Sequence, residues 1–188
     1  MISIHDVAAR VLELHPSCDK MKLYKLCYFS QGWHLAWTGR PLFNEELQAW
    51  KYGAVSPTLR QASELRADDD RRVTQIWSGD SSQLTDYERS VVDTVVSFYG
   101  DLGSFHLSDL SHGFAWSTVR GDLPPDASCS DVIPHSLIRR EFVENAWGEA
   151  PTPNAPSHLP STALDSLEQA ADDVATENAE TLRLLAFI

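Results

Sequence analysis

The feature that most limits how this chain can fold is a stretch near its N-terminus, residues 21–38, that is apolar on almost every face when it is drawn as a helix. Its helical stripes are made by Leu23, Leu26, Cys27, Ser30, His34 and Trp37, by Tyr24, Tyr28, Gln31 and Leu35, and by Phe29, Trp33 and Ala36. The clearly polar flank is narrow and consists mainly of Lys22 and Lys25. A helix of this kind needs other elements around it, so we expect a central, buried helix.

Both ends of this helix are marked in the sequence. Asp19 is a residue type that accepts hydrogen bonds at a helix N-terminus, so we expect it to cap the first turn. Gly39 is suited to the left-handed conformation at a helix C-terminus, and Pro41 follows two residues later, where the helix can no longer continue.

Capping signals and helical spacing predict the elements around the central helix. Ser3 and Asp6 form an approximate capping box, and Thr85 with Glu88 forms a clear one, which favours helix for the valine-rich stretch that follows. The further elements we expect are a helix that starts at Ser56-Pro57, short helices over 104–112 and 114–119, a last core helix that Pro134 opens and that continues through Ile138, Phe142 and Trp147, and a short strand within residues 73–82 that ends at Gly79.

Residues 47–55 alternate imperfectly between apolar and polar and predict a short strand or hairpin arm. In a strand, Trp50 and Tyr52 share one face, which we expect to be buried against the central helix. Lys51 then lies on the opposite face, free to meet a partner or to lie along the aromatic rings, and Gly53 permits a turn. The expected fold class is therefore mainly α with a small β-hairpin.

The overall charge and the cysteines limit the classes of function. A formal net charge of -12 argues against a protein that tracks a nucleic-acid backbone, so we expect no nucleic-acid partner. Three widely spaced cysteines without a C-x-x-C pair are typical of reduced thiols, which predicts a cytoplasmic protein. The most apolar stretch, residues 26–37, is too short and too polar to cross a bilayer, and the N-terminus has no signal-peptide pattern, so we expect no membrane association.

The composition changes near the C-terminus. Residues 148–160 are rich in proline and predict a semi-extended linker. Residues 161–188 predict one amphipathic helix, and residues 149–188 hold seven acids and one arginine. A lone amphipathic helix is marginal in water, so it needs its own domain, another copy or a partner to cover its apolar seam.

No group of residues in the chain matches a pattern for catalysis. His106 and His112 are six residues apart, which does not place both on one helix face as metal ligands. His34 and Cys27 lie on the helix that we expect to be buried, where they are better explained as core residues. The acidic run 68–70 is followed by two arginines and predicts a solvated loop. We therefore expect no enzyme activity, no metal and no cofactor.

Three segments, taken in order, carry a resemblance. They are KLYKLCYFSQGWHLAWTGRPLF, LQAWKYGAVSPTL and LSDLSHGFAWSTVR, and together they closely resemble the Panacea domain family of SocA-like antitoxins, which are often found near phage genes. The matching positions are Lys22, Leu23, Lys25, Leu26, Tyr28, Gln31, Gly32 and Leu35, then residues 49–53, Val55, Pro57 and Leu59, then Leu107, Ser108, His112 and Trp116. Gln48, Ala54 and Ser111 depart from the family pattern, and one residue is missing before Trp116.

The resemblance covers about residues 2–147 and implies a compact, mostly helical antitoxin domain over 1–147, with the linker and the last helix outside it. It implies a non-enzymatic antitoxin that binds and neutralises a toxin encoded beside it. One relative acts instead as a proteolytic adaptor that delivers its toxin to a ClpXP-type protease, and the motifs do not separate the two mechanisms. A phage or prophage regulatory or structural protein without a toxin is a further alternative.

These patterns predict two sets of residues, one that contacts a partner and one that defines the fold. The candidate partner contacts are Lys51 and, on the C-terminal helix, Leu182, Leu185 and Phe187. The residues that we expect to define the fold are Gln31, Gly32, Trp50, Tyr52, Gly53, Pro57, His112 and Trp116. The sequence does not predict the oligomeric state.

Overall fold

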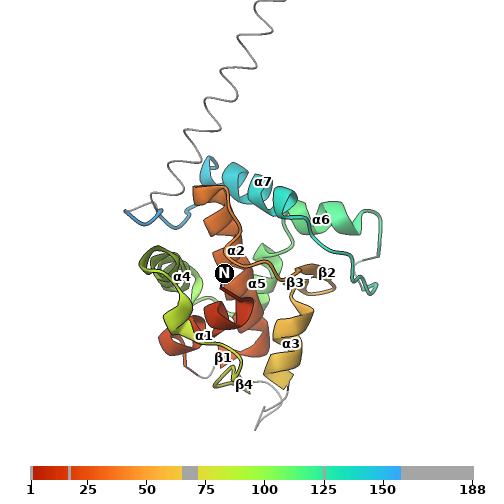
Figure 1. Ribbon diagram of the computed structural model, residues 1–188. Coiled ribbons are helices and arrows are strands. Elements are labelled where there is room, and N and C mark those ends of the chain that lie inside the picture. The colour runs from red at the N-terminus through yellow and green to blue at the C-terminus, as the bar shows by residue number, and fades with distance from the viewer. Residues whose placement is uncertain (1, 17, 65–71, 125, 158–188) are drawn as a thin grey trace, which may run out of the picture. The chain divides into compact units, whose positions relative to one another are not determined.

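The computed structural model describes residues 2–16, 18–64, 72–124 and 126–157, and these residues form a mainly helical fold, as the sequence predicts (Figure 1). The helices are α1 (Ile4–Leu14), α2 (Lys20–Thr38), α3 (Pro57–Glu64), α4 (Asp86–Tyr99), α5 (Ser104–Leu110), α6 (Phe114–Arg120) and α7 (His135–Ala146), with a single 3-10 turn, η1 (Ser81–Gln83). The strands form two small antiparallel pairs, β1 (Cys18–Asp19) with β4 (Arg72–Val73) and β2 (Gln48–Trp50) with β3 (Gly53–Val55).

Helix α2 is the centre of the fold. Helices α1, α3, α4, α5 and α7 all contact it, and Figure 1 shows it passing through the middle of the described helices. Asp19 caps its first turn by accepting a hydrogen bond from the backbone N of Lys22 (3.0 Å), and Gly39 ends it in the left-handed conformation with φ of 72°. The predicted buried helix and both of its predicted ends are confirmed.

The polar side chains of α2 hold the chain segments around it. They recur every three residues, and each bonds a different backbone group: Lys22 Nζ donates to Gly100 O (2.8 Å), Lys25 Nζ to Ala54 O (3.1 Å), Gln31 Nε2 to Phe43 O (2.9 Å), and His34 Nδ1 lies 2.8 Å from Arg40 O. Gln31 Oε1 also accepts from the backbone N of Leu42 (2.7 Å). Since a buried polar group without a partner is costly, this pattern fixes which segment lies against each part of α2.

Tyr28 lies between Lys25 and Gln31, three residues from each, and it bonds a buried carboxyl group on α7. Its hydroxyl donates to Glu141 Oε1 (3.1 Å), while Glu141 Oε2 accepts from the backbone N of Ala115 (2.6 Å) in the first turn of α6. Burial raises the pKa of Glu141, and it also raises the pKa of Tyr28 well above its usual value. A Cβ on Gly113 would lie 2.6 Å from the Glu141 Cδ, so glycine lets α6 approach the carboxyl group. Glu141 thereby joins α2, α6 and α7.

Helix α7 packs closely against α2 at Gly32. A Cβ at this position would overlap the ring of Phe142, which is itself buried in the core. Phe142 packs edge-on against Trp33 and Tyr28, with ring centroids 5.2 and 5.6 Å apart. Gly32 therefore allows the aromatic packing that forms this end of the core.

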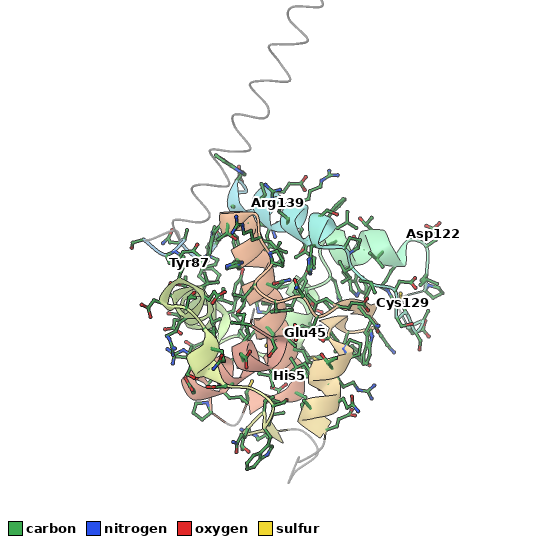
Figure 2. All side chains as sticks on the ribbon, viewed as in Figure 1. His5, Glu45, Tyr87, Asp122, Cys129 and Arg139 are labelled. Atoms are coloured by element: carbon green, nitrogen blue, oxygen red, sulfur yellow. The ribbon has the colours of Figure 1, made fainter. Side chains whose placement is uncertain are left out.

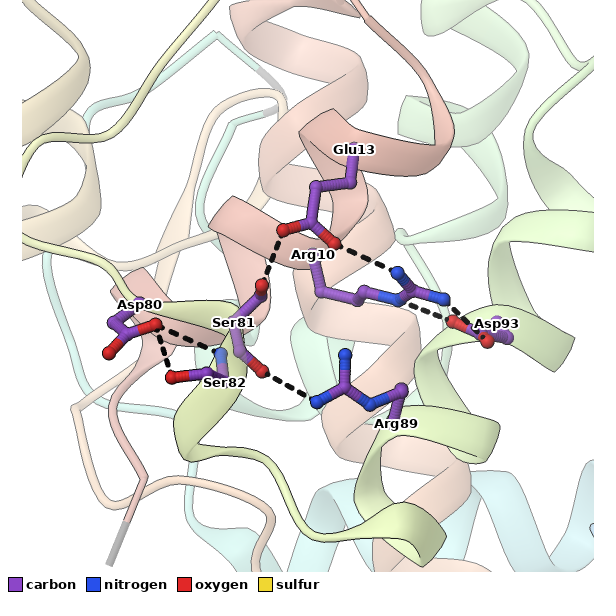
Figure 3. Close-up of polar contacts among 7 residues, drawn as sticks. All are labelled: Arg10, Glu13, Asp80, Ser81, Ser82, Arg89 and Asp93. Carbon is purple, nitrogen blue, oxygen red and sulfur yellow. Dashed lines mark hydrogen bonds and ion pairs between the residues drawn. The ribbon is translucent and has the colours of Figure 1, made fainter.

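Helices α1 and α4 begin at the predicted capping boxes and are joined by charge. Ser3 and Thr85 each accept from the backbone N three residues later, and the carboxylates of Asp6 and Glu88 accept in turn from the backbone N of Ser3 and Thr85. Arg10 Nε and Nη2 donate to the two oxygens of Asp93 on α4 (both 2.8 Å), and Arg10 Nη1 also bonds Glu13 (Figure 3). A guanidinium that bonds a carboxylate through two nitrogens fixes both distance and orientation between the helices.

Three expectations are corrected by the structure. Lys25, which the sequence places on the polar flank of α2, is fully buried. Trp147, expected on the last core helix, is 87% exposed and directly follows α7. The strand expected within residues 73–82 is only the two-residue β4, which starts at Arg72 and ends at Val73, well before Gly79.

The predicted helix over 161–188 lies outside the described residues. The first compact unit of the chain ends at Pro156, and within it Pro153, from the segment predicted as a linker, is buried. The division of the chain at residue 147 stays a prediction.

Candidate partner-binding surface

The three motif segments meet at the hairpin formed by β2 and β3. Its register pairs Gln48 with Val55, Ala49 with Ala54 and Trp50 with Gly53, which leaves Lys51 and Tyr52 as the two residues of the turn. Gly53 has φ of 90°, a conformation that side chains disfavour. A Cβ here would overlap Ser111 Oγ and lie 2.6 Å from Lys25 Nζ, so the close approach of the hairpin to α2 and α5 also requires glycine.

Side chains from the other two motifs bond the carbonyl groups of the hairpin. The donors and acceptors are Lys25 Nζ to Ala54 O (3.1 Å), Ser108 Oγ to Tyr52 O (3.0 Å), Trp116 Nε1 to Trp50 O (2.8 Å) and Arg120 Nη1 to Ala49 O (3.1 Å). These bonds come from α2, α5 and α6, so the order of motifs in the sequence reflects one structural unit. The hairpin is held mainly through its backbone, which leaves its turn side chains available.

Lys25 is an unusual group for such a position. Its amine is buried between the hairpin and α5, and burial lowers its pKa to about 7. His112 lies close by and stacks on Trp116, with ring centroids 4.1 Å apart, and burial lowers its pKa as well. The His112 Nε2 is buried and has no hydrogen-bond partner among the described residues. Both groups are thus placed where their neutral forms are favoured.

The expected burial of the hairpin aromatics is wrong for Tyr52 and only partly right for Trp50. Tyr52 is 52% exposed because it lies in the turn and not in a strand, so it does not share a face with Trp50. Trp50 is half-buried beneath the guanidinium of Arg60, 4.9 Å from its ring centroid. Lys51 is exposed, as expected, with its amine 5.3 Å from the centre of the Tyr52 ring.

A shallow cavity lies beside this turn. It has a volume of about 360 Å³, and Trp50 and Lys51 line it together with Ser128, Cys129 and Ser130 from the loop between α6 and α7. Figure 2 marks Cys129 at this edge of the molecule. Lys51, Tyr52 and the exposed part of Trp50 form what we call the hairpin tip, a surface that a protein partner can reach.

A second surface was missed by the sequence analysis. The end of α4, α5, the start of α6, the end of α7 and residues 148–152 surround a cavity of about 710 Å³, which we call the α4–α7 groove. Trp33 and Tyr99 line it, as do the partly exposed Phe98, Leu110 and Phe114. These residues are distant in sequence, so no local pattern brings them together.

The remaining candidate residues are placed as follows. Pro57 is the first residue of α3, as predicted, and Ser56 O accepts from the backbone N of Arg60 (3.0 Å). Leu182, Leu185 and Phe187 lie outside the described residues. Within the described part of the chain no three His, Cys, Asp or Glu side chains gather as metal ligands, and no helix there is long and apolar enough to cross a membrane.

Comparison with protein families gives a match. A family model described as "Antitoxin SocA-like, Panacea domain" matches residues 23–117, a range that includes the hairpin and nearly all of α2. No curated protein and no solved structure matches the chain.

The close approach at Gly53 predicts a steric effect that can be separated from its backbone conformation. Gly121 also has a positive φ, 52°, but a Cβ there would meet no atom within 4 Å. Both Gly53→Ala and Gly121→Ala should lose on the order of 1 kcal/mol from strained backbone. Gly53→Ala should lose about 1–3 kcal/mol more, because its methyl group must displace Ser111 and Lys25. Urea unfolding of the two variants measures the difference, and equal losses would contradict the packing described here.

The burial of Lys25 predicts how stability changes with pH. The unfolded chain keeps this proton up to about pH 10.5, while the folded chain releases it near pH 7. Between these values the unfolded state binds more protons, so the contribution of Lys25 to the free energy of unfolding rises with pH, by up to about 1.4 kcal/mol per pH unit. The difference between wild type and Lys25→Met, measured by urea unfolding at pH 6, 7.5 and 9, should grow in favour of wild type above pH 7. A difference that stays constant would mean that the amine keeps its ordinary pKa.

Proposed function

The chain belongs to the family of SocA-like antitoxins with a Panacea domain, and on that premise we propose that it neutralises a protein toxin encoded beside it by binding that toxin directly. The observation that carries the proposal is the family match over residues 23–117. The matched range holds most of the side chains that assemble the hairpin on α2, including Lys25, Ser108 and Trp116. The residues matched by the family model therefore form one folded unit, in which the short motifs contact each other.

We further propose that the protein acts by binding and without catalysis. Three of its buried titratable groups support this, since each of the three has a structural task. Lys25 holds the hairpin, Glu141 holds the first turn of α6, and His34 lies against the Arg40 carbonyl that follows α2. Burial also raises the pKa of the Cys18 thiol to about 12, which makes it a poor nucleophile at neutral pH.

The free thiols of Cys18, Cys27 and Cys129 support a reducing compartment, and we propose that the protein works in the cytoplasm. Lys51 stays a candidate contact with the toxin because it is exposed at the hairpin tip beside the exposed ring of Tyr52. A partner's acidic or aromatic side chains would suit that tip. Leu182, Leu185 and Phe187 stay candidate contacts on the evidence of the sequence alone.

Co-expression with the product of the neighbouring gene tests the proposal. That product alone should stop growth, and the full-length chain should restore growth to within about tenfold of an uninduced culture in colony counts. The two purified proteins should elute together in size-exclusion chromatography, because neutralisation by direct binding requires a stable complex. Restoration should be the same in a host that lacks its ClpXP-type protease.

The other outcomes separate the alternatives. Restoration that is lost without the protease would identify a proteolytic adaptor. A neighbouring product that does not affect growth would remove the toxin from the account and leave a regulatory or structural role.

A further inference from the structure

The α4–α7 groove has a floor of fixed aromatic side chains. Tyr99 stacks on Phe29, with ring centroids 4.6 Å apart, and its hydroxyl accepts a hydrogen bond from Trp33 Nε1 (3.2 Å). Phe98 packs edge-on against Tyr99, with centroids 4.7 Å apart. Because these rings are already held by the core, an incoming group would meet a formed surface and little side-chain freedom would be lost on binding.

The sides of the groove leave large apolar side chains in contact with water. Phe98 on α4, Leu110 on α5 and Phe114 on α6 all line it and are all partly exposed. Apolar surface that several elements bring together and that stays open to water is typical of a binding site, because covering it is favourable. The groove volume of about 710 Å³ is large enough for several side chains of a partner.

The shape of the groove favours a helix as its occupant. Its lining comes from helices and from the loop and chain segments that join or follow them, and none of the described strands contributes. An extended peptide would find no strand edge to satisfy its backbone hydrogen bonds there. A helix satisfies its own backbone and can insert side chains spaced three and four residues apart.

The charge of the groove favours a basic occupant. The exposed Glu144 and Glu149 line it, and no lysine or arginine is among the lining residues that the structure describes. Glu141 also lines the groove, but it is buried and bonded to Tyr28 and Ala115. Arg140 lies close by, stacked 4.5 Å from the centroid of Phe114, and it pairs with Glu144 (2.8 Å). This pair offsets the charge of Glu144, so the negative charge of the lining comes mainly from Glu149. The chain as a whole carries a formal charge of -12. The rest of its own C-terminal segment, with six acids and one arginine over residues 153–188, would bring more negative charge to this acidic site.

We propose that the α4–α7 groove is the surface that binds the partner, and that it takes an amphipathic helix whose apolar face is flanked by lysine or arginine. This inference rests on the proposed function, in that the helix would belong to the toxin. The apolar face of that helix covers Phe98, Leu110 and Phe114, and its basic flank faces Glu149 and the Glu144 carboxylate that Arg140 also bonds. The hairpin tip, in contrast, contributes at most a peripheral contact.

A peptide experiment tests the groove without knowledge of the toxin. The probe is a fluorescein-labelled, fourteen-residue helix of leucine and lysine, with leucines on one face, and the control peptide has glutamate in place of lysine. Fluorescence anisotropy measures the Kd of each for the full-length chain at 0.15 M salt, where long-range attraction by net charge is screened. The lysine peptide should bind at least about tenfold more tightly than the glutamate peptide.

Charge-neutral variants separate the groove from general attraction to an acidic protein. Leu110→Ser, alone and with Phe98→Ser, should weaken binding of the lysine peptide by at least about tenfold. Leu123→Ser is the matched control, since Leu123 is 42% exposed against 44% for Leu110 but does not line the groove, and it should leave the Kd unchanged. Melting temperatures within about 4 °C of wild type would show that each variant is folded, and Leu110→Ser alone is the test if the double variant is not.

Several results would overturn the proposal. They are equal binding of the lysine peptide to wild type and to Leu110→Ser, tighter binding of the glutamate peptide, or no binding of either peptide. A dimer of the free chain that Leu110→Ser dissociates would also overturn it, because the groove would then join two copies.

A second measurement keeps the two proposals apart. In the growth assay, Leu110→Ser should lose at least about tenfold of the protection that wild type gives, and Leu123→Ser should keep it. If wild type protects and Leu110→Ser protects equally, the groove proposal fails while the proposed function stands. If wild type does not protect, the proposed function fails, and the peptide measurement still decides what the groove binds.

Discussion

The structure depends on the burial of polar side chains on a helix that has no solvent-facing side. An amine in the position of Lys25 must find an acceptor inside the protein, and it finds the carbonyl of Ala54. That bond brings the hairpin onto α2, and the space beside it leaves room only for glycine at position 53. The same requirement at Tyr28 brings in Glu141, and through it α6. The neighbours of α2 are thus determined in two ways. They cover its apolar surface, and they supply hydrogen-bond partners for its buried polar side chains.

This use of polar groups has a consequence for function. Most of the motif residues, among them Lys25, Gln31 and Trp116, point inward and hold backbone groups, so they build the frame of the domain. Recognition is then left to side chains that the frame exposes. The hairpin tip and the α4–α7 groove are two of the surfaces that expose such side chains, and the groove, which we propose as the partner site, offers the larger apolar surface.

Much of the fold could be predicted because its signals are local. The capping residues Asp19 and Thr85 and the glycine at position 39 mark helix ends through bonds within a few residues, and all were found from the sequence. The burial of Lys25 was not predicted, because a lysine on the flank of a helix is normally exposed to solvent. Its acceptor, the carbonyl of Ala54, is distant in sequence, so no local pattern indicates the bond. The burial of Tyr52 was predicted wrongly because the alternating pattern assigns Tyr52 to a strand. In the structure Trp50 pairs with Gly53, so Tyr52 lies in the turn between the two strands. The groove was missed because its lining comes from helices spread across most of the described chain.

We have proposed that the frame built on α2 presents the α4–α7 groove to a toxin. Hydrogen–deuterium exchange of the full-length chain, alone and in complex with the purified product of the neighbouring gene, tests it most directly. Covering the groove should slow amide exchange in residues 98–114 and 144–152 and leave residues 48–55 of the hairpin almost unchanged. Slowed exchange confined to the hairpin, or a stable complex with no change at the groove, would contradict the account.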